Sequence, residues 1–118
     1  MLKISFIGFR RHSELLRKLF EKQKGNLIYK ILTRSKNNSN SKYIFCSSIK
    51  NLYDSDIIVI SSPTPTHSFY LSKLTNFKGY IFCEKPIVST KKEIEKFLLN
   101  KKINKNYIYT NFNFRFSV

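Results

Sequence analysis

Short apolar runs of strand length alternate along this chain with segments of helical periodicity, and this alternation limits the folds open to it. Ile57–Ile60 is apolar at every position, as is typical of a strand buried on both faces of a parallel sheet. Repeated strand–helix units predict a parallel sheet with helices on both faces. At 118 residues the chain suffices for one core. We therefore expect an α/β fold with a doubly wound parallel sheet, Rossmann-like, forming a single three-layer domain over residues 1–118.

The expected elements follow from apolar spacing and from turn residues. The strands are predicted at Leu2–Ile7, Leu27–Leu32, Tyr43–Cys46, Ile57–Ile60, Gly79–Cys83 and Tyr107–Phe112. A first helix places Leu15, Leu16, Leu19 and Phe20 on one face, and Ile49–Tyr53 forms one or two turns. A second helix runs from His67 to about Phe77 with Thr66 as its cap. In a third, Thr90 and Glu93 form a capping box, and Ile94, Phe97 and Leu98 face inward.

Composition narrows the class of protein. The net charge is +15, which is compatible with a nucleic-acid partner, but the lysines are scattered along the chain and no familiar nucleic-acid-binding motif is present. The favoured explanation is compositional drift, because lysine shares AT-rich codons with the abundant Asn, Ile, Phe and Tyr, so nucleic-acid binding ranks last among the hypotheses. Cys46 and Cys83 lie apart inside apolar runs and are interpreted as small buried hydrophobic residues rather than as metal ligands.

No apolar run is long enough for a membrane span or signal peptide, so the expected compartment is the cytoplasm.

Ligands of open parallel sheets bind beyond the carboxyl ends of the strands, so we looked for function there. Four segments follow predicted strands, and three of them carry distinctive polar residues. The segments are Gly8-Phe9-Arg10, Thr33-Arg34, Ser61–His67 and Glu84-Lys85-Pro86.

Several of these motifs together resemble those of the Gfo/Idh/MocA oxidoreductases. The stretch Asp56–His67 is similar to that family's buried fourth strand followed by Pro-(Asn or Thr)-x-x-His. Glu84-Lys85-Pro86 stands where the family carries Glu-Lys-Pro, and Asn113–Phe116 is similar to its later Arg-Phe pair. The resemblance covers essentially the whole chain, and its specificity comes from the order and spacing of the motifs.

The resemblance implies an NAD(P)-dependent oxidoreductase and a role for each matching residue. Ser62, Pro63, Thr64 and the loop to His67 would lie against the cofactor, although His67 is equally interpretable as a helix residue bonded to nearby backbone. Glu84 would face the nicotinamide ribose. Lys85, the expected catalytic residue, would lie near the reacting carbon, where its ammonium would favour developing negative charge. Pro86 would follow a cis peptide bond that directs Lys85 into the site.

The phosphate loop departs from the pattern of dinucleotide folds. Those folds use Gly-x-Gly-x-x-Gly between the first strand and helix, whereas this chain has Gly8-Phe9-Arg10-Arg11-His12. Aligning Arg11-His12 with an Arg-His pair of the family leaves a gap of about four residues. Phe9 and Arg10 would crowd a pyrophosphate, which predicts weakened binding. Alternatively, Arg10 and Arg11 would meet phosphate at the helix N-terminus.

The second strand lacks the acidic ending that holds the adenosine ribose of NAD. Thr33 and Arg34 stand there instead, which slightly favours NADP over NAD, although a plain polar loop is nearly as good a reading.

The length is the second departure. The family continues for about a further domain, which supplies the substrate pocket, and that C-terminal substrate domain is expected to be absent here. The leading hypothesis is accordingly the NAD(P)-binding domain of an oxidoreductase acting on a sugar or cyclitol alcohol, truncated or split. The substrate domain would then come from a separate chain, or the chain would form a homo-oligomer. The alternative is a non-catalytic interaction or regulatory module that keeps the fold, with Phe112, Phe114 and Phe116 contacting a partner.

Overall fold

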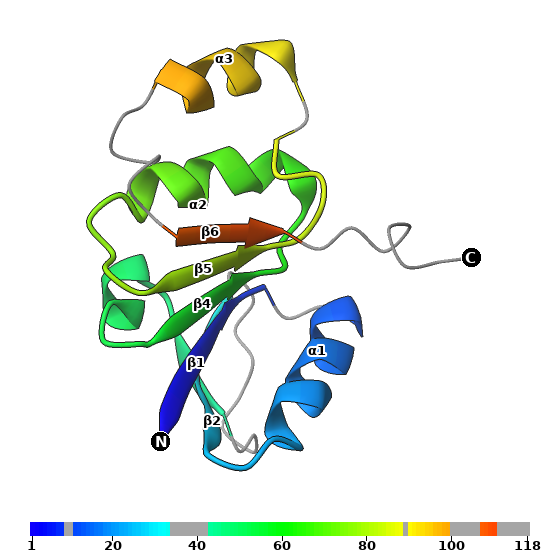
Figure 1. The fold of residues 1–118 in the computed structure, drawn as a ribbon, viewed down its shortest axis with the longest axis vertical. Helices are drawn as coiled ribbons and strands as arrows, with labels where there is room; N and C mark the ends of the chain where they lie inside the picture. The colour runs from blue at the N-terminus through cyan, green and yellow to red at the C-terminus, as the bar shows by residue number, and fades with distance from the viewer. Residues whose placement is uncertain (9–10, 34–42, 89, 100–106, 111–118) are drawn as a thin grey trace.

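The structure is a computed structural model that describes residues 1–8, 11–33, 43–88, 90–99 and 107–110. Its centre is a six-stranded sheet of order β3-β2-β1-β4-β5-β6 in which every neighbouring pair is parallel (Figure 1). The strands are β1 (Leu2–Ile7), β2 (Asn26–Leu32), β3 (Ile44–Cys46), β4 (Ile57–Ile60), β5 (Tyr80–Cys83) and β6 (Tyr107–Thr110). This is the strand order of dinucleotide-binding folds. The predicted α/β, doubly wound, Rossmann-like fold is confirmed, with β4 as an inner strand.

The connections supply the helices. They are α1 (Arg11–Glu21), α2 (His67–Lys73) and α3 (Lys91–Leu99), with two short 3-10 turns, η1 (Ile49–Leu52) and η2 (Thr64–Thr66). In Figure 1, α1 lies beside β1 and β2, whereas α2 and α3 lie toward β5 and β6. The helical turn predicted at Ile49–Tyr53 is therefore present as η1.

Two apolar clusters, one on each face of the sheet, form the core. Along β4, Ile58 and Ile60 pack with Leu52 of η1 and Leu71 of α2, on one face. Val59 points to the other face, where Leu16 and Phe20 of α1 cover it together with residues of β1 and β2. Successive residues of β4 thus serve opposite layers, as the all-apolar sequence of this strand predicts.

Several predictions about the helices are wrong in detail. Of the four apolar residues predicted to face inward from α1, Leu16 and Phe20 pack on the sheet, whereas Leu15 and Leu19 are exposed; Arg17 is buried. The guanidinium of Arg17 lies over the rings of Phe6 and Tyr43, so its charge is held against aromatic faces. The apolar stripe of α1 is therefore narrower than its sequence suggests.

The other two helices differ in their ends and faces. The α2 helix stops at Lys73 rather than near Phe77, although Phe77 is still buried in the core. Thr66 makes no capping bond; its hydroxyl donates to Ser62 Oγ and to the carbonyl of Pro63. In α3 the backbone N–H of Glu93 donates to Thr90 Oγ1, as the capping box predicts, but Ile94 is exposed rather than inward.

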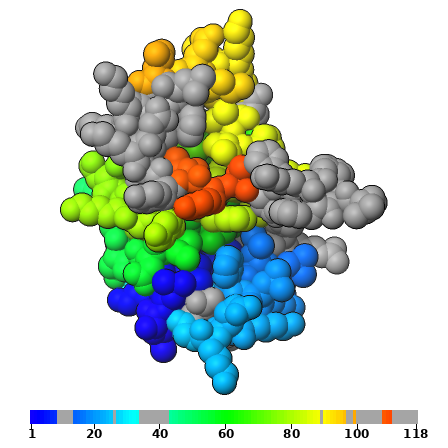
Figure 2. Space-filling model, in the orientation of Figure 1, coloured from blue at the N-terminus to red at the C-terminus, as the bar shows by residue number. Residues whose placement is uncertain are grey.

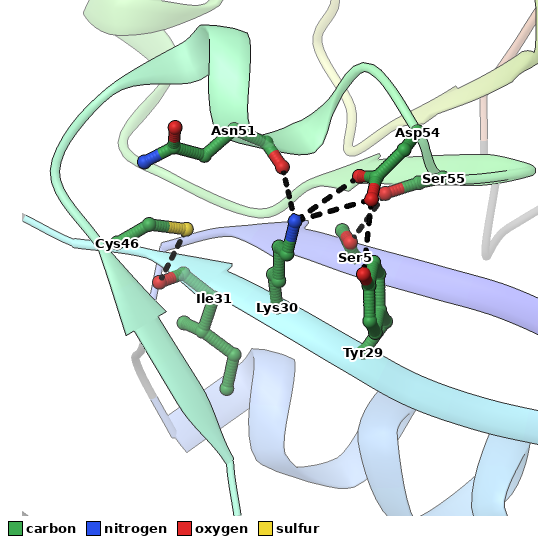
Figure 3. Close-up of polar contacts among 8 residues, drawn as sticks. All are labelled: Ser5, Tyr29, Lys30, Ile31, Cys46, Asn51, Asp54 and Ser55. Carbon is green, nitrogen blue, oxygen red and sulfur yellow. Dashed lines mark hydrogen bonds and ion pairs between the residues drawn. The ribbon is translucent and has the colours of Figure 1, made fainter.

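A bulge in β2 gathers a polar cluster on the η1 side of the sheet. The register of β1 with β2 shifts between Ile4 and Phe6, where three steps of β2 match two of β1. The extra residue lets Tyr29 and Lys30 both reach Asp54 (Figure 3). Lys30 Nζ also donates to the carbonyl of Asn51 at 2.8 Å. We call Tyr29, Lys30, Asn51 and Asp54 the Lys30 cluster.

Charge pairing decides the ionisation of this cluster. Desolvation would raise the Asp54 pKa, but hydrogen bonds from Tyr29 and Lys30 outweigh it and lower that pKa. Desolvation likewise opposes the Lys30 ammonium, yet the hydrogen bond and charge of Asp54 outweigh it and raise the Lys30 pKa. Both groups therefore favour their charged forms.

Part of the sheet surface lies outside the cover of α1. Tyr80 of β5 and Tyr109 of β6 are about half exposed, with ring centroids 6.2 Å apart, and β6 is visible at the surface in Figure 2. Within the described residues, no helix is long and apolar enough to cross a membrane.

Candidate cofactor site

The carboxyl ends of the inner strands form one continuous edge. Backbone hydrogen bonds tie the residue after each strand to its neighbour: Gly8 N–H to Leu32 O, Ser61 N–H to Ile7 O, and Glu84 N–H to Ile60 O. Gly8, Ser61 and Glu84 therefore stand in adjacent positions just beyond β1, β4 and β5. The chain turns outward in opposite directions from β1 and β4, which is the switch point where such sheets bind ligands.

Gly8 has the conformation and the surroundings that exclude a side chain. Its φ is +105°, a region that residues with a Cβ rarely adopt. A Cβ at this position would lie 2.9 Å from the backbone nitrogen of Ser62 and 3.0 Å from the carbonyl carbon of Ser61. The tight turn that the first glycine of the fingerprint provides is thus present here.

The connection from β1 to α1 is short. The α1 helix begins at Arg11, so only residues 8–10 separate it from β1. Counting from Gly8 without a gap, Arg10 and Ser13 occupy the second and third glycine positions of the fingerprint. The gap of about four residues that the family alignment implies stays a prediction beside this ungapped count. Phe9 and Arg10 lie outside the described residues, so their predicted proximity to phosphate stays a prediction.

The loop after β4 is held by its own polar groups. Ser61 is buried, and its hydroxyl donates to the carbonyl of Ile7 at 3.2 Å. Ser62 Oγ accepts from Thr66 across the turn, with Pro63 and Thr64 between them at the start of η2. Sequence reasoning missed Ser61, although a hydroxyl next to the switch point is the available signal. The loop bearing three of the predicted cofactor contacts is therefore ordered by local bonds.

His67 joins this loop to the loop after β5. The side chain is 1% exposed; Nε2 lies 2.8 Å from the carbonyl oxygen of Ser62, and Nδ1 lies 2.8 Å from that of Pro86. Both ring nitrogens are therefore engaged by backbone. Of the two sequence interpretations of His67, this geometry fits the helix residue bonded to backbone. We call Ser62, Thr66, His67 and Pro86 the His67 cluster.

Glu84, Lys85 and Pro86 follow β5 beside this cluster. Glu84 is buried, Lys85 is half-buried, and the Lys85–Pro86 peptide bond is cis, as the resemblance implied. Burial of the neighbouring Cys83 thiol, with a smaller contribution from the Glu84 charge, raises the Cys83 pKa to about 12. This thiol is protonated at physiological pH and is no nucleophile. Cys46, predicted to be buried, is only partly so.

At the end of β2, Thr33 is half-buried, and its N–H donates to the carbonyl of Cys46 at 3.4 Å. The sequence carries no carboxylate at this position. Arg34 lies outside the described residues. Within the part of the chain that the structure describes, no group of three or more His, Cys, Asp or Glu side chains is placed to hold a metal ion.

These features suit a dinucleotide better than a metal or a covalent intermediate. Gly8 permits the close approach of the Ser61–Ser62 backbone, and the start of α1 offers N–H groups to an anion. A buried carboxylate and a lysine lie at the far end of the same edge, beyond β5. The edge therefore offers an anion-binding end and a hydrogen-bonding end.

Comparison with known proteins agrees with this geometry. The profile of the Gfo/Idh/MocA family, described as "Oxidoreductase family, NAD-binding Rossmann fold", matches residues 2–112. A search of curated proteins gives no match.

Solved structures of dehydrogenases share the fold. One is myo-inositol 2-dehydrogenase from Lactobacillus plantarum, with a TM-score of 0.78 and 24% identity over 98% of this chain and 38% of that one. Another is scyllo-inositol dehydrogenase from Lactobacillus casei, with a TM-score of 0.77 and 19% identity; the match covers 99% of this chain and 38% of that one. A third is the WlbA dehydrogenase from Chromobacterium violaceum in complex with NADH and UDP-GlcNAcA, with a TM-score of 0.77 and 12% identity. That match covers 93% of this chain and 34% of the other.

The present chain thus spans about two fifths of the length of these dehydrogenases. The similarity to each is below 25% identity and concerns the fold. The family profile covers nearly the whole chain. The chain belongs to the Gfo/Idh/MocA oxidoreductase family and corresponds to its NAD-binding Rossmann fold.

Proposed function

We propose that this chain binds a nicotinamide dinucleotide along the carboxyl edge of its sheet. The observation that carries the proposal is the alignment of Gly8, Ser61 and Glu84 at the switch point, in a chain whose family is NAD-binding. The pyrophosphate would lie over Gly8 toward the start of α1, near Phe9 and Arg10. The nicotinamide would lie beyond β4 and β5, where Ser62, Pro63 and Thr64 line one side. Glu84 would accept hydrogen bonds from the nicotinamide ribose.

We extend the proposal to hydride transfer with a sugar or cyclitol-type alcohol. A bound NAD(P)⁺ would accept the hydride from the carbinol carbon, and the hydroxyl proton would leave to solvent. Lys85 would hold the substrate oxygen and stabilise its developing negative charge. Because the chain matches about two fifths of its relatives' length, the substrate pocket would require a further part, on another chain or through self-association. The cytoplasm remains the predicted compartment.

The test is a titration of NADPH, NADH and ADP-ribose into the purified chain, followed by calorimetry and by the melting midpoint. A ligand that binds only the folded form raises the midpoint. We expect saturable binding of both dinucleotides, with ADP-ribose weaker because it lacks the nicotinamide. Glu84→Gln should weaken binding of NADH and of ADP-ribose alike, because both carry the ribose whose hydroxyls Glu84 would accept from. Glu95→Gln, at an exposed carboxylate on α3, is the matched control.

Cofactor choice is tested at the end of β2. Thr33 lacks the carboxylate that holds the adenosine ribose of NAD, so NADPH should bind at least as well as NADH. Thr33→Asp should move the preference toward NADH, since a carboxylate accepts from the 2′-hydroxyl and repels a 2′-phosphate. Absence of binding by either dinucleotide at about 1 mM, far above ordinary cofactor affinities, in a chain that melts cooperatively, would favour the interaction module instead.

A further inference from the structure

The ring of His67 faces two groups of the same kind. Carbonyl oxygens accept hydrogen bonds and never donate, and each ring nitrogen of His67 lies 2.8 Å from one of them. A neutral imidazole carries a single N–H, so it satisfies one carbonyl and turns a lone pair toward the other. Both contacts are satisfied only when each ring nitrogen carries a proton.

Because His67 is buried, the number of protons on its ring determines whether both carbonyls have a donor. His67 is 1% exposed, so water does not compensate a carbonyl left without a donor. The two carbonyls also belong to different loops, Ser62 after β4 and Pro86 after β5. A ring that donates in both directions therefore ties the two loops together by two charge-assisted hydrogen bonds, which are stronger than neutral ones.

A carboxylate lies close in sequence to one of these two loops. Glu84, two residues before Pro86, is the buried carboxylate of this edge, and its backbone is fixed by the bond from its N–H to Ile60 O. The remaining members of the cluster, Thr66 and Ser62, are neutral hydroxyls bonded to each other. Lys85, next to Pro86 in the chain, is half-buried.

We infer that His67 is a positioning residue that carries a proton on each ring nitrogen and clasps the loop after β4 to the loop after β5. The clasp sets where Glu84 and Lys85 stand relative to Ser62 and Thr64. Its effect on the nicotinamide end of the cofactor rests on the proposed function; the clasp itself does not.

The ring protons are measured directly by nitrogen NMR of the histidine side chains, without nucleotide, at about pH 7.5, where an ordinary imidazole of pKa about 6.5 is mostly neutral. The chain has only two histidines, so His12→Gln leaves the His67 signals alone in the spectrum. We expect two protonated nitrogens for His67 in the folded chain. A single bare nitrogen at His67 overturns the inference.

Two substitutions test the positioning. His67→Phe keeps a ring but removes both donors, and His67→Gln keeps donors on one nitrogen only. We expect His67→Phe to weaken NADPH or NADH binding about tenfold, because small displacements of contact groups are costly, with His67→Gln intermediate. Backbone amide signals should shift in both variants at the non-proline residues of the two loops, Ser62, Thr64, Glu84, Lys85, Ile87 and Val88. Ser72→Ala, exposed on the same helix, is the control.

The outcomes separate the two claims. Wild-type binding in both His67 variants, with unmoved amide signals, overturns the positioning role. If the unmodified chain binds no dinucleotide, the proposed function fails, and the ring protons and amide shifts alone decide the clasp. If His67→Phe does not fold, His67→Gln and the ring protons still decide it.

Discussion

The His67 cluster and the Lys30 cluster are built from similar polar groups in opposite ways. Around His67 the ring is buried, and its partners are backbone carbonyls of two different loops. Around Lys30 the charged groups pair with each other, and half of the Asp54 side chain is exposed. Solvent screens the second arrangement and not the first. The comparison teaches that the positions of the loops at the carboxyl edge depend on a single buried side chain, whereas the Lys30 cluster contributes little to the free energy of folding.

The largest effect should come from the glycine that abuts the His67 cluster. Gly8→Ala places a Cβ 2.9 Å from the Ser62 nitrogen, at a φ of +105°. Backbone must move at the loop that His67 holds, so we expect a loss of about 2–4 kcal/mol in the free energy of unfolding, together with loss of nucleotide binding. Chemical denaturation measures the first.

Gly25→Ala is the matched control, because Gly25 also has a positive φ, +88°, but has open space around it. Its cost should be limited to the backbone conformation, roughly 1 kcal/mol. Equal losses at the two glycines would contradict the close approach at Gly8.

Next in size is the substituted phosphate loop. Arg10 takes the second glycine position in the ungapped alignment, where a side chain crowds a pyrophosphate. Arg10→Gly should therefore raise nucleotide affinity, by about tenfold if the fingerprint geometry is restored, equivalent to 1.4 kcal/mol. Calorimetry with NADH measures this. A fall in affinity would instead support a direct arginine–phosphate contact, and Arg11→Gln would then reduce it further.

The two clusters also show which parts of the structure were predictable. Strand positions followed from apolar runs such as Ile57–Ile60, because burial on both faces leaves a strong local signature. The strand ends that form the candidate site were predictable in the same way, whereas the cofactor contacts assigned to them stay predictions. The role of His67 was not decided by the sequence, because its partners are carbonyls, which every residue carries.

Non-local packing explains the errors as well. Arg17 is buried because Phe6 and Tyr43, distant in sequence, offer it aromatic faces. The Lys30 cluster depends on a bulge in β2, and a bulge leaves no mark in residue spacing. Such features require the tertiary arrangement that they help to stabilise.

Each cluster has a cysteine nearby, and the two thiols should differ in reactivity. Burial raises the Cys83 pKa to about 12. Desolvation also raises the pKa of Cys46, but the Lys30 charge opposes it and the side chain is partly exposed. A thiol reagent at about pH 8.5, near the ordinary thiol pKa, should modify Cys46 first and reach Cys83 only on unfolding. Cys46→Ser isolates the Cys83 rate, and fast modification of that variant in its folded state would contradict the buried site.

The smallest effect should come from the Lys30–Asp54 pair, whose contact is 3.2 Å. Asp54→Asn should lower the free energy of unfolding by no more than about 0.5 kcal/mol, because an exposed pair is screened and the amide keeps a hydrogen bond to Tyr29.

The pH dependence of this contribution has a definite sign. The lowered Asp54 pKa gives stability that is present above the ordinary carboxyl pKa and lost as the pH falls through the folded value. The raised Lys30 pKa gives stability that is present below the ordinary amine pKa and lost as the pH rises through its folded value. The difference between wild type and Asp54→Asn should therefore be largest between about pH 4 and pH 10, and it should shrink with added salt. A difference that salt leaves unchanged would mean that the Lys30 cluster is as well shielded as the His67 cluster, and the contrast between the two would fail.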